Sequence, residues 1–171
     1  MNDDARKKLL SLIEFGIVAV VLAILTILIV PSLMRTIKER RASEASENVR
    51  VLFNLASDYY TKAVAENGGE NFDVSFPPSM EAPHPAEVSN KSASTSDWHM
   101  VPAFRDLGFE LTTPHFYQYQ FTSEGEGDSA RFMISAFGDL DGDGHKSRFQ
   151  MEGYIENGEV RGNAITVDRL E

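Results

Sequence analysis

The sequence predicts an α+β fold, in which a long N-terminal, membrane-anchoring helix packs on a C-terminal antiparallel sheet of three or four strands. Three observations lead to this fold class. Residues 9–34 are apolar apart from one charge, and residues 49–63 repeat apolar side chains every three or four positions. Residues 116–167 contain short β-prone runs separated by turn residues. The first two patterns are typical of helices and the third is typical of strands.

The apolar run predicts a membrane anchor. Residues 15–34 carry no charge, and ~20 helical residues at ~1.5 Å per residue cover the ~30 Å core of a bilayer. The run is longer than the core of a signal peptide and no small-residue cleavage site closes it, so we expect an uncleaved anchor. Residues 1–8 then form a leader-like polar segment, residues 9–34 the transmembrane and assembly half of the helix, and residues 35–171 a soluble head.

The helix is expected to continue into the head. Residues 35–66 become amphipathic, and the triplet Asn67, Gly68 and Gly69 is a strong stop signal for a helix. Pro31 removes one backbone hydrogen bond and is expected to kink the helix.

The rest of the head is expected to be a connection followed by strands. Residues 70–97 are irregular, residues 101–107 favour a short helix, and Asn157 and Gly158 favour a tight hairpin. Strands are predicted at residues 116–122, 131–137, 148–155 and 159–167. The helix should bury some of its apolar side chains against the sheet, with these residues taking part: Leu52, Phe53, Tyr59 or Tyr60 on the helix, and Phe132, Ile134 and Phe149 on the strands.

Composition excludes several classes of function. The chain has no Cys, which excludes disulfides and thiolate metal sites. Residues 42–171 hold nine basic and twenty-two acidic side chains, a net charge of −13 that argues against a nucleic-acid partner. The four His residues have no zinc-ligand spacing, and no catalytic motif is present. We therefore expect a protein that is not an enzyme.

One motif favours a metal ion. Asp139, Asp141 and Asp143 alternate along a Gly-rich loop, as in the first half of an EF-hand, with a His145 carbonyl and Ser147 as further candidate ligands for Ca²⁺. The twelfth position is Gln150 instead of the bidentate Glu, so a true EF-hand is not expected. A calcium loop of another type and a plain polar turn both stay open, because Asp and Gly also favour turns.

The N-terminal run resembles a known family. The residues Ser11, Leu12, Ile13 and Glu14, the apolar run and Pro31, seventeen residues after the acid, are similar to the N-terminal segment of type IV pilins and type II secretion pseudopilins. The resemblance implies a pilin-like fold and a homo-oligomeric filament, assembled from a bacterial inner membrane by pilus or secretion machinery and exposed outside the cell. It implies that Glu14 pairs with the N-terminal amine of a neighbouring subunit and that Pro31 marks where the helix loosens.

The same comparison places a processing site between Leu9 and Leu10. Leu9 stands where the family has Gly, and Ala23 stands where the family has a helix-loosening Gly. An unprocessed, membrane-tethered binding module therefore stays open as an alternative, with Lys7 or Lys8 as the partner of Glu14. A major pseudopilin of a type II secretion system is the other alternative.

Overall fold

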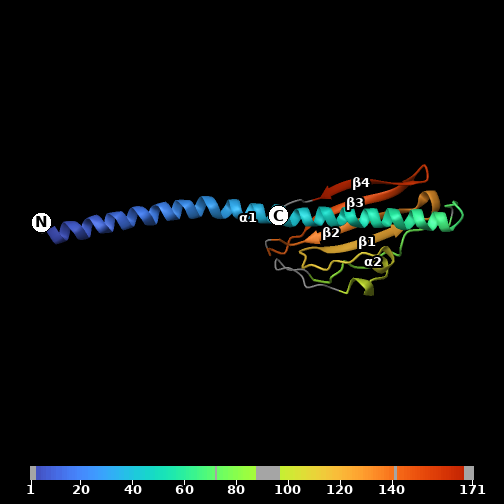
Figure 1. Ribbon diagram of the computed structural model, residues 1–171, viewed down its shortest axis with the longest axis horizontal. Coiled ribbons are helices and arrows are strands. Elements are labelled where there is room, and N and C mark those ends of the chain that lie inside the picture. The colour runs from blue at the N-terminus through green and yellow to red at the C-terminus, as the bar shows by residue number, and fades with distance from the viewer. Residues whose placement is uncertain (1–2, 72, 88–96, 141, 168–171) are drawn as a thin grey trace. The chain divides into compact units, whose positions relative to one another are not determined.

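The computed structural model describes residues 3–71, 73–87, 97–140 and 142–167, while the side chains of residues 3–12, 30–35, 37–38 and 165–167 lie outside the description. The chain divides into two compact units, Met1–Glu39 and Arg40–Glu171. Helix α1 (Asp3–Glu66) contributes its first part to one unit and its second part to the other (Figure 1).

The described residues of the first unit, 3–39, are all helical. Leu, Ile, Val and Ala fill residues 17–30 apart from one polar side chain, Thr26, whose hydroxyl donates to the Leu22 carbonyl over 2.8 Å. This bond to the carbonyl four residues earlier satisfies the hydroxyl without disturbing the helix. Pro31 lies inside α1, and its side chain lies outside the described part of the structure.

The predicted fold class was wrong. Taken over their described residues, none of the helices combines the length and the apolar character that crossing a membrane requires. The pilin-like arrangement, in which a sheet packs on a long membrane-anchoring helix, is therefore not the fold of this chain. The architecture is instead a helical first unit and a second unit in which helices accompany a four-stranded antiparallel sheet.

The sheet of the second unit is a simple meander. Strands β1 (Gln118–Glu124), β2 (Arg131–Gly138), β3 (Ser147–Glu156) and β4 (Glu159–Val167) pair in chain order, each antiparallel to the next. Asn157 and Gly158 join β3 to β4 with φ angles of 55° and 77°, as a type I′ turn requires. The four predicted strands and this hairpin are confirmed, with boundaries shifted by two residues at β1 and one at β2 and β3.

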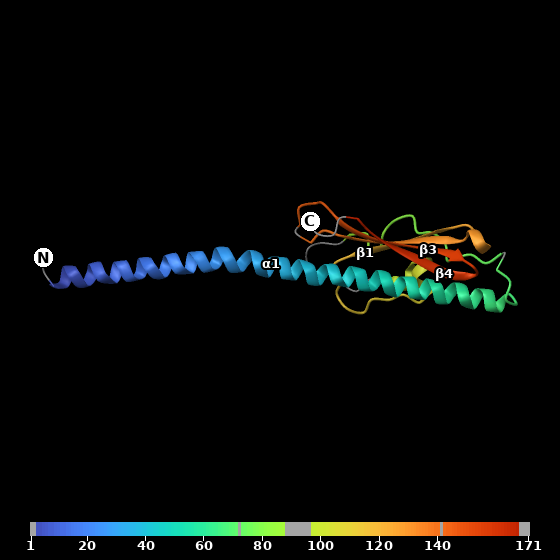
Figure 2. The ribbon, with the colours of Figure 1, turned by 90° about the horizontal axis from the view of Figure 1, so that it is seen from above.

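Residues 40–66 of α1 run along one face of this sheet (Figures 1 and 2). The helix ends where the stop signal predicts, and Gly69 donates its N–H to the Val64 carbonyl over 2.9 Å. Gly68 and Gly69 have φ angles of 74° and 89°, a left-handed conformation that glycine adopts without a Cβ penalty.

Aromatic rings fill the space between helix and sheet. The centre of the Phe132 ring lies 5.5 Å from that of Phe53 on α1, 4.6 Å from that of Phe76 in the connection between α1 and β1, and 5.5 Å from that of Phe121 on β1. Gly153 on β3 makes room for the same ring, because a Cβ there would lie 2.1 Å from the Phe132 Cζ. Leu52, Tyr60, Ile134 and Phe149 are buried around this cluster. These contacts bring five separate stretches of the chain together.

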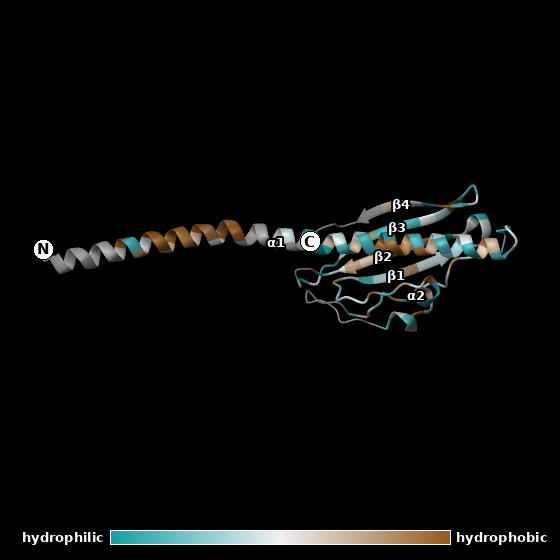
Figure 3. Ribbon diagram, in the orientation of Figure 1, coloured by the Kyte–Doolittle hydropathy of each residue, from teal (hydrophilic) through white to brown (hydrophobic). Residues whose placement is uncertain are grey.

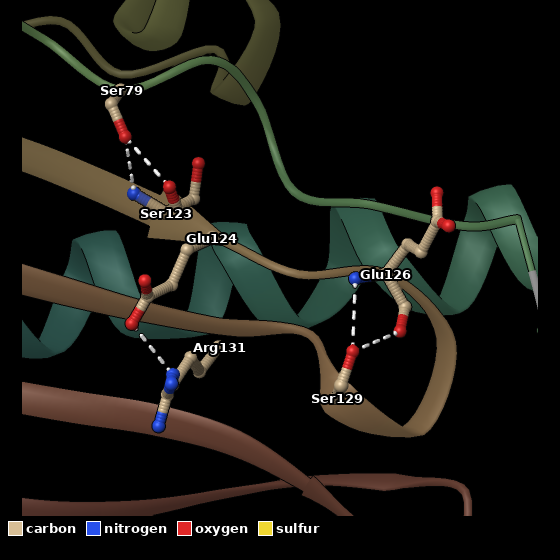
Figure 4. Close-up of polar contacts among 6 residues, drawn as sticks. All are labelled: Ser79, Ser123, Glu124, Glu126, Ser129 and Arg131. Atoms are coloured by element: carbon tan, nitrogen blue, oxygen red, sulfur yellow. Dashed lines mark hydrogen bonds and ion pairs between the residues drawn. The ribbon is translucent and has the colours of Figure 1, made fainter.

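The connection after α1 covers the outer edge of β1. Met80 donates its N–H to the Phe121 carbonyl over 2.8 Å, and His84 exchanges two backbone bonds of 2.8 and 2.7 Å with Tyr119. Figure 4 shows the next contact, where the Ser79 hydroxyl donates to the Ser123 carbonyl and accepts from its N–H, both over 2.7 Å. These bonds satisfy an edge that would otherwise be open to strand pairing.

Short helices occur in the connection and between β1 and β2. The connection passes through η1 (Trp98–Met100) and α2 (Pro102–Leu107), which confirms the predicted short helix. Between β1 and β2 lies η2 (Gly127–Ser129), where Glu126 and Ser129 form a capping box (Figure 4). Beside it, Glu124 and Arg131 form a 2.7 Å ion pair across the two strands (Figure 4). This pair is exposed, so its contribution to stability is small.

Candidate functional site

The first candidate site is an exposed apolar segment, residues 13–29 of α1. Every side chain in this segment is exposed, and the exposed fraction reaches 75% for Phe15 and 70% for Ile27. Figure 3 shows most of the segment in brown, after a short teal stretch near its N-terminal end. An isolated chain that leaves so much apolar surface in water is unfavourable, since monomeric proteins rarely expose contiguous apolar patches above a few hundred Å².

Glu14 is the one ionisable side chain in the segment, and it is exposed. The other residues of the predicted assembly and processing sites, Pro31, Leu9 and Leu10, lie in α1, and their side chains lie outside the description. The pairing of Glu14 with a cation, and cleavage between Leu9 and Leu10, therefore stay predictions.

The second candidate site is the loop between β2 and β3. The Asp139 carboxylate accepts two backbone bonds, from the Gly142 N–H over 2.7 Å and from the Gly144 N–H over 3.1 Å. Asp143 accepts a bond of 2.8 Å from the His145 N–H. Gly142 and Gly144 have φ angles of 80° and 91°, which turn their amides inward without Cβ strain. The Asp139 carboxylate thus stabilises the loop by accepting hydrogen bonds from two of its backbone amides.

The remaining predicted ligands differ in their exposure to solvent. His145 is exposed, whereas Ser147 is buried and its hydroxyl donates to the Gly138 carbonyl over 2.8 Å. Asp141 lies outside the described residues. Within the described ranges no group of three His, Asp or Glu side chains is arranged to hold a metal ion. The Ca²⁺ site at these residues stays a prediction, and Asp139 has a structural role in either case.

We expect Asp139→Ala to lower the melting temperature of the second unit even in a chelator, where no calcium is bound. The change removes the acceptor of two backbone bonds to a charged group, which contributes about 1–3 kcal/mol to the free energy of unfolding. Asp143→Ala should cost less in chelator, since it removes one exposed bond. If the loop also holds Ca²⁺, calcium should raise the melting temperature of the wild type but not of Asp143→Ala. Differential scanning calorimetry in both buffers checks this.

A polar contact ties α1 to the start of the sheet within the second unit. Asn48 donates to the Tyr119 hydroxyl over 2.7 Å, and the Glu44 carboxylate accepts the Phe116 N–H over 3.1 Å. The Arg41 guanidinium lies 4.0 Å from the centre of the Phe116 ring. Burial raises the pKa of Glu44 and the pKa of Tyr119 above their usual values. The contact fixes the register of helix and strand.

Sequence reasoning marks Trp98 as an apolar anchor of the connection but does not predict its contacts with His84 and His115. The Trp98 indole lies 5.0 Å from the His84 ring and 5.2 Å from the His115 ring, measured between centroids. Trp98 and His115 are each 1% exposed. Among the described residues, three buried nitrogens lack a hydrogen-bond partner: His84 Nε2, Trp98 Nε1 and His115 Nε2. Burial lowers the pKa of both His84 and His115, so both imidazoles are favoured in the neutral form.

A cavity of about 440 Å³ opens beside this cluster. Its lining comes from the connection and from the segment that carries η1 and α2, and it is mostly Pro, Ala and Val. Met80, His84 and Met100 are the lining side chains with soft donor atoms. A second cavity, of about 310 Å³, lies over β1, β2 and β3 and is lined by Ser, Thr and charged side chains together with Phe132 and Met133.

Comparison with known proteins adds no assignment: no protein-family model, curated protein or solved structure matches this chain.

Proposed function

We propose that this chain is a structural subunit of a filament, which assembles with copies of itself through residues 13–29 of α1. The observation that carries the proposal is the exposure of every side chain in that segment. The proposed function is not enzymatic, and the acidic second unit would form the part of the subunit that meets solvent.

The shape of the apolar surface favours many neighbours over one. A helix that is apolar on one stripe is covered by a single partner, but a helix that is apolar all round must be buried on all sides. Two copies in a closed dimer would leave the far side of each helix in water. Repeated contacts that do not close bury every side and produce an open, helical assembly.

Glu14 constrains how the copies meet. A carboxylate buried among apolar helices is costly unless a cation or hydrogen-bond donors satisfy it. In an assembly of identical chains, such a donor recurs at every subunit and fixes the axial offset between neighbours. The neighbour's N-terminal amine, Lys7 and Lys8 are the proposed partners. Assembly from a bacterial inner membrane by pilus or secretion machinery stays a prediction that rests on the family resemblance.

We expect Val21→Asp to abolish self-association of the full chain, because it places an unpaired charge in a surface that must be desolvated. Val51→Asp is the matched control: Val51 lies on the same helix within the second unit and is 38% exposed, against 49% for Val21. Sedimentation velocity after detergent removal, followed by negative-stain microscopy, measures the assembly. Wild type and Val51→Asp should form elongated particles, and Val21→Asp should sediment as a monomer.

Two outcomes would contradict the proposal. One is a wild-type chain that stays monomeric without detergent at micromolar concentration. The other is a wild-type chain that enters lipid vesicles as single copies, shown by the absence of crosslinks between neighbours. The second outcome would favour the tethered binding module, because lipid would then cover the segment in place of other subunits.

A further inference from the structure

Strand β4 leaves one edge of the sheet open. It is the last strand in the order β1-β2-β3-β4, and among the described residues no backbone group pairs with its outer side. In Figure 1 it runs along the margin of the second unit. The opposite edge, β1, is covered by the connection through the backbone bonds of Met80 and His84. Of the two edges, that of β4 is therefore the one available to another strand.

The pairing of β4 with β3 indicates which of its backbone groups face outward. A two-residue turn closes on a hydrogen-bonded pair, here Glu156 and Glu159, and such pairs alternate with non-bonded pairs along an antiparallel ladder. The even-numbered residues of β4 therefore direct their N–H and C=O groups away from β3. Those with described side chains are Val160, Gly162 and Ala164. The edge thus offers a regular set of donors and acceptors to a further strand.

β4 lacks the features that usually protect an edge strand. Its pairing with β3 keeps one register over all nine residue pairs, so no bulge turns the strand away from a partner. Residues 159–167 contain no Pro and no Lys, the residues that commonly block an edge. Gly162, Asn163 and Ala164 are small and exposed, so a second backbone can approach them.

Charge favours a second copy of the chain as the partner. Residues 42–171 carry a net charge of −13, which opposes the approach of two copies over most of this surface. Residues 159–167 hold one acid and one base, Glu159 and Arg161, which form a 2.7 Å ion pair with each other. Two copies can therefore meet along this neutral edge without the repulsion that acts elsewhere.

We infer that β4 pairs antiparallel with β4 of a second copy about a two-fold axis and continues the four-stranded sheet across both copies. Such a contact uses the same edge on each copy, so it closes at two copies and does not use residues 13–29. One strand pair buries little surface, and we expect a dissociation constant of about 0.1 mM. In the proposed filament the edge would recur at every subunit and join neighbouring filaments side by side. This consequence alone depends on the proposed function.

Hydrogen exchange of the full chain in detergent micelles tests the inference, because detergent covers residues 13–29 and suppresses assembly through them. NMR measures amide exchange at protein concentrations about tenfold below and about tenfold above the expected dissociation constant. The outward amides of Val160, Gly162 and Ala164 should gain protection at the higher concentration. The amides of Arg161 and Asn163, which bond to β3, should be protected at both concentrations.

Ala164→Pro removes an outward N–H at a position where an edge strand tolerates Pro. It should raise the dissociation constant at least about tenfold, measured by sedimentation equilibrium in the same micelles. Ala164→Ser keeps the N–H and is the matched control. Asn163→Lys keeps the backbone and adds a charge to the neutral edge, so it should also weaken pairing. It decides the test if Ala164→Pro lowers the urea midpoint of the second unit.

A wild type that stays monomeric in micelles at the higher concentration would overturn the inference. So would equal dissociation constants for Ala164→Pro and Ala164→Ser with equal urea midpoints, or concentration-dependent protection that omits the outward amides of β4. Val21→Asp should pair in micelles as the wild type does, because Val21 lies outside the edge. Its behaviour at micromolar concentration without detergent tests the proposed function separately.

Discussion

Replacing Phe132 by Ala is expected to lower the free energy of unfolding of the second unit by about 3–5 kcal/mol. Phe132 is 2% exposed and its ring contacts three other rings, those of Phe53, Phe76 and Phe121. Removing it leaves a cavity between helix, connection and sheet, which these large side chains cannot close without leaving their rotamers. Because typical domains are stable by only about 5–15 kcal/mol, this is a large fraction of the total.

The matched control is Phe15→Ala, the same change at a side chain that is 75% exposed in the first unit. Urea unfolding of the full chain followed by Trp98 fluorescence reports on the second unit, which contains the single Trp. Phe15→Ala should leave the midpoint unchanged. A loss below about 1 kcal/mol for Phe132→Ala would mean that the aromatic cluster is not the centre of the core.

Much of the second unit could be predicted from local patterns. The stop signal at Asn67 marks the end of α1, and the hairpin at Asn157 and Gly158 marks the turn into β4, because both depend on residues that adopt left-handed backbone. The strands follow from β-branched and aromatic runs between such turns. The predicted membrane-anchoring, pilin-like fold class was wrong, because it extended a pattern in residues 9–34 to an arrangement of the whole chain.

The candidate sites differ in how much of each could be predicted from the sequence. Asp139 was singled out for its spacing, but spacing does not reveal that its carboxylate is taken up by the Gly142 and Gly144 amides. The Trp98 cluster could not be predicted, because His84 and His115 lie on opposite sides of Trp98 in the sequence and meet only through folding. Their pattern in the sequence is that of scattered surface residues. The burial that leaves the ring nitrogens of His84 and His115 without partners results from long-range packing.

Burial of His115 leads to a second large effect, on the pH dependence of stability. We expect the free energy of unfolding to fall as the pH is lowered from about 7.5 to about 5.5, and to fall less in His115→Gln. Burial is the main cause that lowers the pKa of His115 below 6.5, the nearby His84 lowers it further, and the bond to the Thr113 carbonyl opposes the shift. His84 shifts in the same direction through burial alone.

The sign follows from which state takes up the proton. Below about pH 6.5 the unfolded chain protonates its His residues, while the folded chain keeps His115 neutral, so protons favour unfolding. The stabilising contribution is therefore complete above about pH 6.5 and is lost as the pH falls toward the lowered pKa of the folded state. Where the folded and unfolded states differ by one bound proton, the free energy of unfolding changes by about 1.4 kcal/mol per pH unit.

Glu44 has an opposing effect on the pH dependence. Burial raises its pKa above the usual 4.5, so the folded state takes up this proton before the unfolded state does, and stability gains from Glu44 as the pH falls. Glu44 is present in every variant compared, so the difference between their slopes reports on the substituted His. His145→Gln is the control, since His145 is exposed. Urea unfolding at several pH values should give a shallower slope for His115→Gln than for His145→Gln, and equal slopes would show that His115 is protonated as readily in the folded chain as in the unfolded one.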